Sequence, residues 1–198
     1  MAFIGMQHVV AAKIATETAG SALTYSAGMV IGKAIQGNIT WTHSDNPLYA
    51  DDAIAENDNT RTEGSLELGL DDLLDDARVY VLGDTKNTVS TGVYSYELTD
   101  DPSPNVGVGY IRVRRKGGTT TYQGVWLYKV NFVEDAENSQ TKGEQIEWQT
   151  PTITGKIMGV VIDSSGKNHF AIRQEFTTLS DAVSWLDTKA SVPTQPNQ

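Results

Sequence analysis

The stretch GVGYIRVRRKGGTTTYQGVWLYKVNFV, residues 107–133, indicates the fold class of this 198-residue chain. Apolar and polar residues alternate in two runs, 107–116 and 119–133, which are separated by Gly117 and Gly118. Alternation with period two is typical of half-buried strands, and a two-residue glycine turn between such runs is typical of a β-hairpin. The second strand is expected to hold most of the aromatic area of the core on one face, formed by Tyr122, Trp126, Tyr128, Val130 and Phe132.

Strand-like patterns extend over most of the remaining sequence. We expect strands at residues 7–14, 29–43, 61–69, 92–98 and 143–154, and a further hairpin of 157–163 and 168–176. The strand at 29–43 has apolar odd positions, Ile31, Ile35, Ile39 and Trp41, and uncharged polar even positions, Gln36, Asn38, Thr40 and Thr42. The sequence therefore predicts a mainly β fold with four largely buried aromatic residues: Trp41, Trp126, Tyr128 and Trp148.

Two segments have helical spacing instead. Residues 70–82 are expected to form an amphipathic helix whose apolar positions are Leu70, Leu73, Leu74, Ala77 and Val81. Gly83 follows as a stop signal. Residues 179–190 are expected to form a short helix with Ser180 as its N-cap. We interpret residues 1–176 as a single domain, and residues 177–198 as a C-terminal short helix with a loose tail.

The charge of the chain is concentrated in one window. The net charge is −10, and residues 45–76 hold eleven carboxylates opposed only by Arg61, so this window alone accounts for it. Such an acidic chain is a poor sequence-independent DNA binder, because affinity for DNA comes largely from neutralising phosphates. It is better suited to a surface past which DNA slides. The chain has no cysteine, no apolar run near the ~20 residues of a membrane span, and no signal-peptide pattern, so we expect assembly in a reducing cytoplasm.

The connection at residues 45–60 is unusually long for a link between two strands. Long connections are usually functional, and this one combines acidic residues with large apolar ones. We predict an arm that docks on another molecule. Its candidate contact residues are Asp45, Leu48, Tyr49, Asp51, Asp52, Ile54, Glu56 and Asp58.

One basic cluster, Arg112, Arg114, Arg115 and Lys116, has two interpretations. It could bind nucleic acid, but it lacks an alternating aromatic platform. We prefer that Arg112, Arg114 and Arg115 pair with carboxylates of a neighbouring copy. The three histidines are far apart and lack metal-ligand spacing, so no metal or cofactor is expected. Asp163, Ser164 and His169 surround a hairpin turn, and we expect no enzyme.

The ordered set of segments resembles the major tail proteins, or tail tube proteins, of phages with long non-contractile tails, especially those of Gram-positive hosts. The likeness lies mainly in residues 61–83, which include ELGLDDL at 67–73, and in residues 141–159, which include GEQIEWQTP at 143–151. With the order of strands it covers about residues 1–175. The resemblance implies a β-sandwich or half-barrel of two packed antiparallel sheets with one flanking α-helix.

The resemblance also implies a function and partners. Hexameric rings of this chain would stack into a tail tube around a tape-measure protein, contact tail terminator and distal tail proteins, and later conduct DNA. The chain would then belong to the virion, after assembly in the host cytoplasm, with no membrane contact. The inner wall should be hydrophilic and neutral to acidic, and its candidates are Gln36, Asn38, Thr40, Thr42, Gln145 and Glu147.

Two alternatives remain open at this point. The same polar residues could lie on the outer surface of the assembly. The chain could instead be a secreted or virion-surface β-sandwich adhesin or carbohydrate-binding module, which would need an exposed aromatic platform.

Overall fold

The computed structural model describes residues 2–89, 92–96, 102–134, 141 and 148–193. The two helices are α1 (Asp75–Val81) and α2 (Leu179–Ala190). The strands are β1 (Ala2–Thr16), β2 (Thr24–Gly32), β3 (Ala34–His43), β4 (Asn46–Ala50), β5 (Ala53–Asp58), β6 (Arg61–Leu70), β7 (Thr85–Val89), β8 (Gly92–Tyr96), β9 (Asn105–Lys116), β10 (Thr119–Glu134), β11 (Thr152–Ile157), β12 (Val160–Val161), β13 (Asn168–His169) and β14 (Ala171–Phe176).

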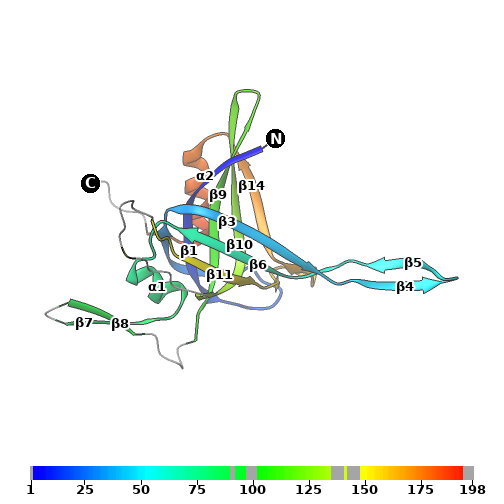
Figure 1. Ribbon diagram of the computed structural model, residues 1–198, viewed down its shortest axis with the longest axis horizontal. Helices are drawn as coiled ribbons and strands as arrows, with labels where there is room; N and C mark the ends of the chain where they lie inside the picture. Colours follow the sequence, from blue (N-terminus) through cyan, green and yellow to red (C-terminus); the bar gives the residue numbers. More distant parts are fainter. Residues whose placement is uncertain (1, 90–91, 97–101, 135–140, 142–147, 194–198) are drawn as a thin grey trace.

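Eight strands form one antiparallel sheet around β10 (Figure 1). Seven of them follow the order β2-β1-β9-β10-β11-β6-β3, and β14 pairs with β10 off this path. Two strands pair with the same edge of β10: residues 122–127 of β10 pair with β14, and residues 130–134 pair with β11. The pairs β4–β5, β7–β8 and β12–β13 form separate hairpins.

The main core lies where the sheet curls over itself. Val9, Leu66, Val108, Phe132 and Ile153 come from five different strands, yet all belong to one cluster with at most 1% of each side chain exposed. Antiparallel layers that pack face to face, with a helix at their side, confirm the predicted mainly β architecture, which is consistent with a β-sandwich.

A bulge in β10 exchanges the faces of that strand. The pairing of β10 with β9 shifts register between Leu127 and Val130. Before the shift, Leu127 faces the main core and Trp126 faces α2; after it, Val130 and Phe132 face the main core. The prediction that Tyr122, Trp126, Tyr128, Val130 and Phe132 share one face is therefore wrong, because an extra residue breaks the period of two.

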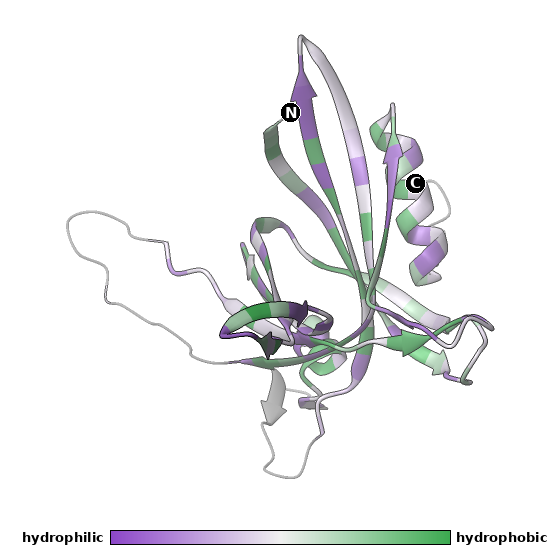
Figure 2. Cartoon of the chain, turned by 90° about the vertical axis from the view of Figure 1, so that its right-hand side faces the viewer, coloured by the Kyte–Doolittle hydropathy of each residue, from purple (hydrophilic) through white to green (hydrophobic). Residues whose placement is uncertain are grey.

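A second, smaller core lies between the sheet and α2 (Figure 2). Ala182, Leu186 and Ala190 of α2 are fully buried against Ile111 and Trp126 of the sheet. The helix has the predicted bounds, but its N-cap is Thr178 rather than Ser180. The Thr178 hydroxyl accepts the N–H of Asp181 at 3.2 Å, since residue 178 is the last with extended backbone before the helix.

Helix α1 is shorter than the predicted helix over residues 70–82. Strand β6 continues to Leu70, which pairs with Ala34, and the Asp71 carboxylate accepts the N–H of Lys33 at 2.8 Å. Strand pairing thus outweighs the helical spacing of the first residues. Leu74 is mostly exposed, so the predicted apolar helix face is wrong at this position.

The expected strand at 29–43 is interrupted. Strand β2 ends at Gly32, and β3 begins at Ala34. Ile35 is exposed, because the pairing of β3 with β6 shifts register between Ala34 and Gln36.

The predicted hairpin between β9 and β10 is confirmed. Gly117 and Gly118 have φ values of 57° and 85°, which suit the type I′ turn of a two-residue hairpin loop.

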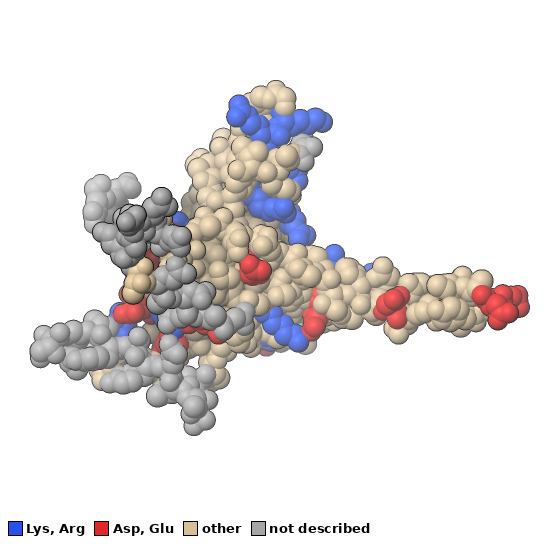
Figure 3. All heavy atoms as spheres, in the orientation of Figure 1, with Lys and Arg blue, Asp and Glu red and all other residues tan. Residues whose placement is uncertain are grey.

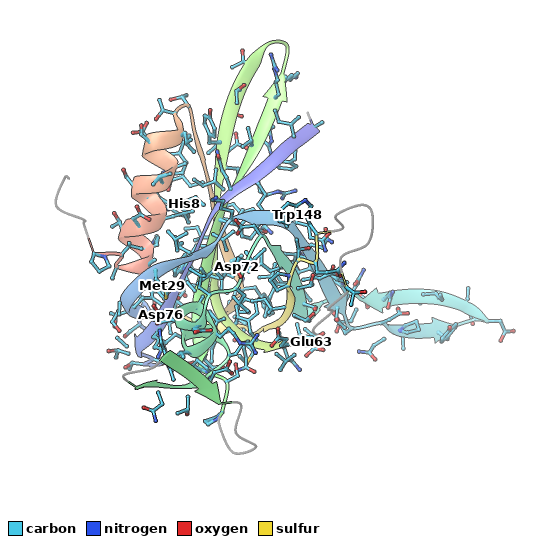
Figure 4. All side chains as sticks on the ribbon, turned by 60° about the vertical axis from the view of Figure 1, so that its left-hand side comes forward. His8, Met29, Glu63, Asp72, Asp76 and Trp148 are labelled. Atoms are coloured by element: carbon cyan, nitrogen blue, oxygen red, sulfur yellow. The ribbon has the colours of Figure 1, made fainter. Side chains whose placement is uncertain are left out.

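The four predicted core aromatics differ in their burial. Trp126 is fully buried, whereas Trp41 and Tyr128 are partly buried. Trp148 is 84% exposed, so its predicted burial is wrong. It precedes β11, which begins only at Thr152, and it lies well away from the aromatic layer beneath α2 (Figure 4).

A cluster of buried charges attaches α1 to the end of β10. The Arg78 guanidinium donates from Nε to Asp84 Oδ2 at 2.9 Å, and its Nη1 and Nη2 reach Glu134 Oε1 and Oε2 at 3.1 and 2.7 Å. Burial disfavours the charged guanidinium, but the hydrogen bonds that it donates to Glu134 and Asp84 hold the Arg78 pKa above its ordinary value.

Candidate functional site

The predicted arm is a two-stranded ribbon that projects from the body (Figures 1 and 3). The register of β4 and β5 runs from the pair Asn46–Asp58 to the pair Ala50–Ala53. Asp51 and Asp52 form the turn with φ values of 51° and 60°, which aspartate tolerates better than most residues. The position of the arm was predicted from the sequence, but its two strands were not. Asp-Asp is a weaker hairpin signal than Asn-Gly or Asp-Gly.

Hydrogen bonds fix the arm where it leaves the sheet. Ser44 N–H donates to the Thr60 carbonyl at 2.7 Å, and Thr60 N–H donates to Ser44 Oγ at 2.9 Å. The Asn57 amide donates to Asp45 Oδ1 at 3.0 Å, and the Thr60 hydroxyl donates to an oxygen of Asp58. The ribbon therefore continues β3 and β6 without a loose joint.

The surface of the arm is apolar to an unusual degree. Leu48, Tyr49 and Ile54 are 59%, 66% and 59% exposed. Tyr49 and Ile54 are directly paired and share one face, while Leu48 is paired with Glu56 on the other. An isolated two-stranded hairpin is only marginally stable in water, and contiguous exposed apolar groups mark interaction sites. The arm thus has the surface of an element that is completed by a partner.

The four polar residues predicted on β3 do share an exposed face. Asn38 pairs with Glu67, Thr40 with Ser65, and Thr42 with Glu63. Beneath them, the alternate positions Leu66 and Leu68 face the main core. The same face continues onto β11, because Glu67 pairs with Thr154 and Ser65 with Lys156. We call the following set the polar face: Gln36, Asn38, Thr40, Thr42, Glu63, Ser65, Glu67, Thr154 and Lys156.

Both carboxylates of the polar face have a partner within it. The Gln36 amide donates to Glu67 Oε1 at 2.7 Å, and Lys156 Nζ lies 2.7 Å from Glu63 Oε2. Glu63 lies close to the arm, since β6 begins at Arg61 (Figure 4). Sequence reasoning missed the part on β6 and β11, although alternation in 61–70 and 152–157 was the available signal. The other two candidates, Gln145 and Glu147, lie outside the described residues.

The basic cluster lies near the end of the β9–β10 hairpin, away from the arm (Figure 3). Arg114 pairs with Glu175 of its own chain, so for Arg114 the predicted pairing with a neighbouring copy is not needed. The Arg112 guanidinium lies 3.5 Å from the centroid of the Phe3 ring. Burial, followed by repulsion from Arg173 and Arg114, lowers the Arg112 pKa from its ordinary value. Arg115 is exposed.

Within the described residues, no three His, Asp or Glu side chains gather as they would around a metal ion. His8 lies 2.8 Å from Asp187, and His169 lies 3.2 Å from Asp163. The first pair joins β1 to α2, and the second lies within the β12–β13 hairpin. In the same part of the chain, neither helix has the length and apolar character needed to cross a membrane.

Comparison of the sequence with protein families and with curated proteins finds no match. The function must therefore be argued from the arm, the polar face and the basic cluster themselves.

Proposed function

We propose that this chain is a structural virion subunit, which assembles with copies of itself into hexameric rings stacked as the tail tube of a long-tailed, non-contractile phage. The observation that carries the proposal is the projecting arm, whose large apolar side chains, Leu48, Tyr49 and Ile54, are mostly exposed to solvent. A protein that acts alone gains nothing from such an element. A protein that polymerises uses it to hold the next copy, through a head-to-tail contact that propagates as a filament.

The edges of the sheet support ring formation. Strands β2 and β3 lie at the two ends of the strand order. Edge strands present unpaired N–H and C=O groups, which invite pairing with another chain. A closed ring of copies satisfies these groups and leaves no free edge.

The polar face suits the inner wall of such a tube. It is hydrophilic, and its one lysine, Lys156, is paired with Glu63. A wall without unpaired cations adds no counterion-release affinity for phosphates, so DNA can pass without being held. In this proposal the lumen first holds a tape-measure protein, the ends of the tube meet terminator and distal tail proteins, and the subunit has no catalytic role.

Removing the arm tests the proposal most directly. Residues 45–59 can be replaced by Asn-Gly, which joins the hydrogen-bonded residues Ser44 and Thr60 through a two-residue turn. We expect a folded monomer, because a change of loop length alters stability only weakly. By electron microscopy of concentrated protein, the unchanged chain should form rings or tubes and the variant should form neither. Long tubes from the armless variant would contradict the proposal.

Chemical protection tests the inner wall. Because the chain has no cysteine, Asn38→Cys provides a unique thiol on the polar face, and Ser184→Cys provides a matched thiol on the exposed side of α2. A maleimide attached to a large poly(ethylene glycol) should label both thiols in monomers. In assembled tubes it should label residue 184 and leave residue 38 unmodified. Equal labelling of both positions in tubes would place the polar face on the outside.

A second candidate function rests on Trp148. An aromatic ring that is 84% exposed is the kind of group on which carbohydrate-binding modules stack sugars. The adhesin alternative predicts that the chain stays monomeric and binds glycans, with the binding lost in Trp148→Ala. A glycan array probed with both proteins separates the two functions.

A further inference from the structure

Two groups of charged side chains of opposite sign lack ion-pair partners within the described residues. The first, the acidic tip, consists of Asp51 and Asp52 at the turn of the arm, since Asp45 and Asp58 already accept hydrogen bonds at its base. The second, the basic patch, consists of Arg112, Lys116 and Arg173 on β9 and β14. Charges left unpaired in this way gain most from a partner of opposite sign.

The basic patch is built by strand register. Arg112 pairs with Gln123 and Arg173 pairs with Val125, so both arginines lie on the same face of β9, β10 and β14. Glu175 supplies a carboxylate there, and it binds Arg114. Burial, followed by repulsion from Arg173 and Arg114, lowers the Arg112 pKa, and the repulsion is consistent with an excess of positive charge on this face.

Each charged group lies beside exposed apolar side chains. Phe3 and Ile4, which are 39% and 58% exposed, lie on β1 next to the arginines of β9. Tyr49 and Ile54 lie next to the turn that holds the acidic tip. Both surfaces therefore combine an apolar area with charges at its border, as protein interfaces do.

The acidic tip cannot contact the basic patch of its own chain. The arm and the β9–β10 hairpin extend from the body in different directions, with the acidic tip at the end of one and the basic patch near the end of the other (Figures 1 and 3). Any second copy of the chain carries both surfaces. A ribbon with strands of five or six residues reaches roughly 17–20 Å beyond the sheet, far enough to lie across a neighbouring molecule.

We propose that the arm of one copy docks on the basic patch of another, with the acidic tip against Arg112, Lys116 and Arg173, and with Tyr49 and Ile54 against Phe3 and Ile4. The inference rests on the proposed function, because it names the surface that receives the arm. The contact joins different surfaces of two copies, so it is head-to-tail and can be repeated from one copy to the next. Its electrostatic part weakens as salt rises.

Charge reversal tests the contact. The patch variant carries Lys116→Glu and Arg173→Glu, both at exposed positions. The arm variant carries Asp51→Asn and Asp52→Gly, which keep a turn-forming pair, with Ala53→Lys beside the turn. Each variant alone is expected to weaken association by about tenfold or more in sedimentation measurements at low salt. A chain that carries both sets should associate nearly as well as the unchanged chain, and the control Lys167→Glu should have no effect.

The outcomes separate this inference from the proposed function. If the unchanged chain remains a monomer at every concentration, both fail. If it assembles and the reversals change nothing, or the combined variant is no better than the single ones, only the docking contact is overturned. If the patch variant assembles normally but loses affinity for short duplex DNA that the unchanged chain binds, the patch contacts nucleic acid, and the docking contact is likewise overturned.

Discussion

Replacing Trp126 with alanine is expected to lower the free energy of unfolding by about 3–5 kcal/mol, the usual cost of truncating a large buried aromatic side chain. Trp126 is fully buried and meets the ring of Tyr25 edge to face, with centroids 4.9 Å apart. Its ring lies so close to Gly107 and Gly109 that a Cβ at either glycine would come within 2.5 and 2.7 Å of it. The cavity is bordered by paired strand backbone and by α2, which cannot collapse into it freely.

Urea unfolding followed by circular dichroism measures this loss. Trp148→Ala is the matched control, because its side chain is 84% exposed and its removal should change the free energy of unfolding by no more than about 0.5 kcal/mol. A loss below about 1 kcal/mol for Trp126→Ala would mean that α2 does not pack on this face as the structure places it.

Local patterns were sufficient to predict much of the sheet. Alternation in β3 placed Gln36, Asn38, Thr40 and Thr42 together on an exposed face, because side chains two residues apart share a face wherever the strand is regular. The turn at Gly117 and Gly118 was equally readable, since few residues other than glycine adopt both positive φ values. Both features depend only on residues close in sequence.

Features that depend on distant residues were not predictable. The bulge between Leu127 and Val130 occurs where the partner of β10 changes from β14 to β11. The sequence pattern of residues 119–133 does not indicate a bulge. The start of α1 depends on the pairing of Leu70 with Ala34. Trp148 was placed in a strand because its neighbours alternate, yet the paired strand begins later.

In the candidate surfaces, too, local features could be predicted and features that depend on distant residues could not. The position and character of the arm followed from the length and composition of residues 45–60. The partner of Arg114 could not be predicted in this way, because Glu175 is distant in sequence and comes close to Arg114 only through the pairing of β14 with β10. The extension of the polar face onto β6 and β11 likewise required the register of three strands.

Replacing Arg78 with methionine is the second change expected to have a large effect, about 3–5 kcal/mol of lost stability. Methionine preserves much of the volume of the side chain but removes the cation that binds both Asp84 and Glu134, whose side chains are 9% and 15% exposed. The two carboxylates would then remain buried without a counter-charge, and α1 would lose its attachment to the end of β10. Their shared guanidinium bridges elements more than fifty residues apart in sequence.

The pH dependence of this contribution has a definite sign. The Arg78 pKa is raised in the folded chain, so the stability that its pairing contributes is fully present below the ordinary pKa of arginine. Alkaline pH within the range where proteins stay folded therefore cannot reproduce the effect of the substitution. Thermal unfolding of Arg78→Met at neutral and at mildly alkaline pH should show the same deficit.

Two control variants distinguish an unpaired buried charge from a general loss of packing. Lys156→Met breaks the exposed pair with Glu63 and should cost at most about 1 kcal/mol, because water screens surface ion pairs. Combining Arg78→Met with Asp84→Asn and Glu134→Gln removes the uncompensated charges, and it should recover a large part of the stability lost in Arg78→Met alone. If the triple variant is no more stable than Arg78→Met, the cost lies in packing around α1 rather than in the charges, and the electrostatic explanation of this attachment is wrong.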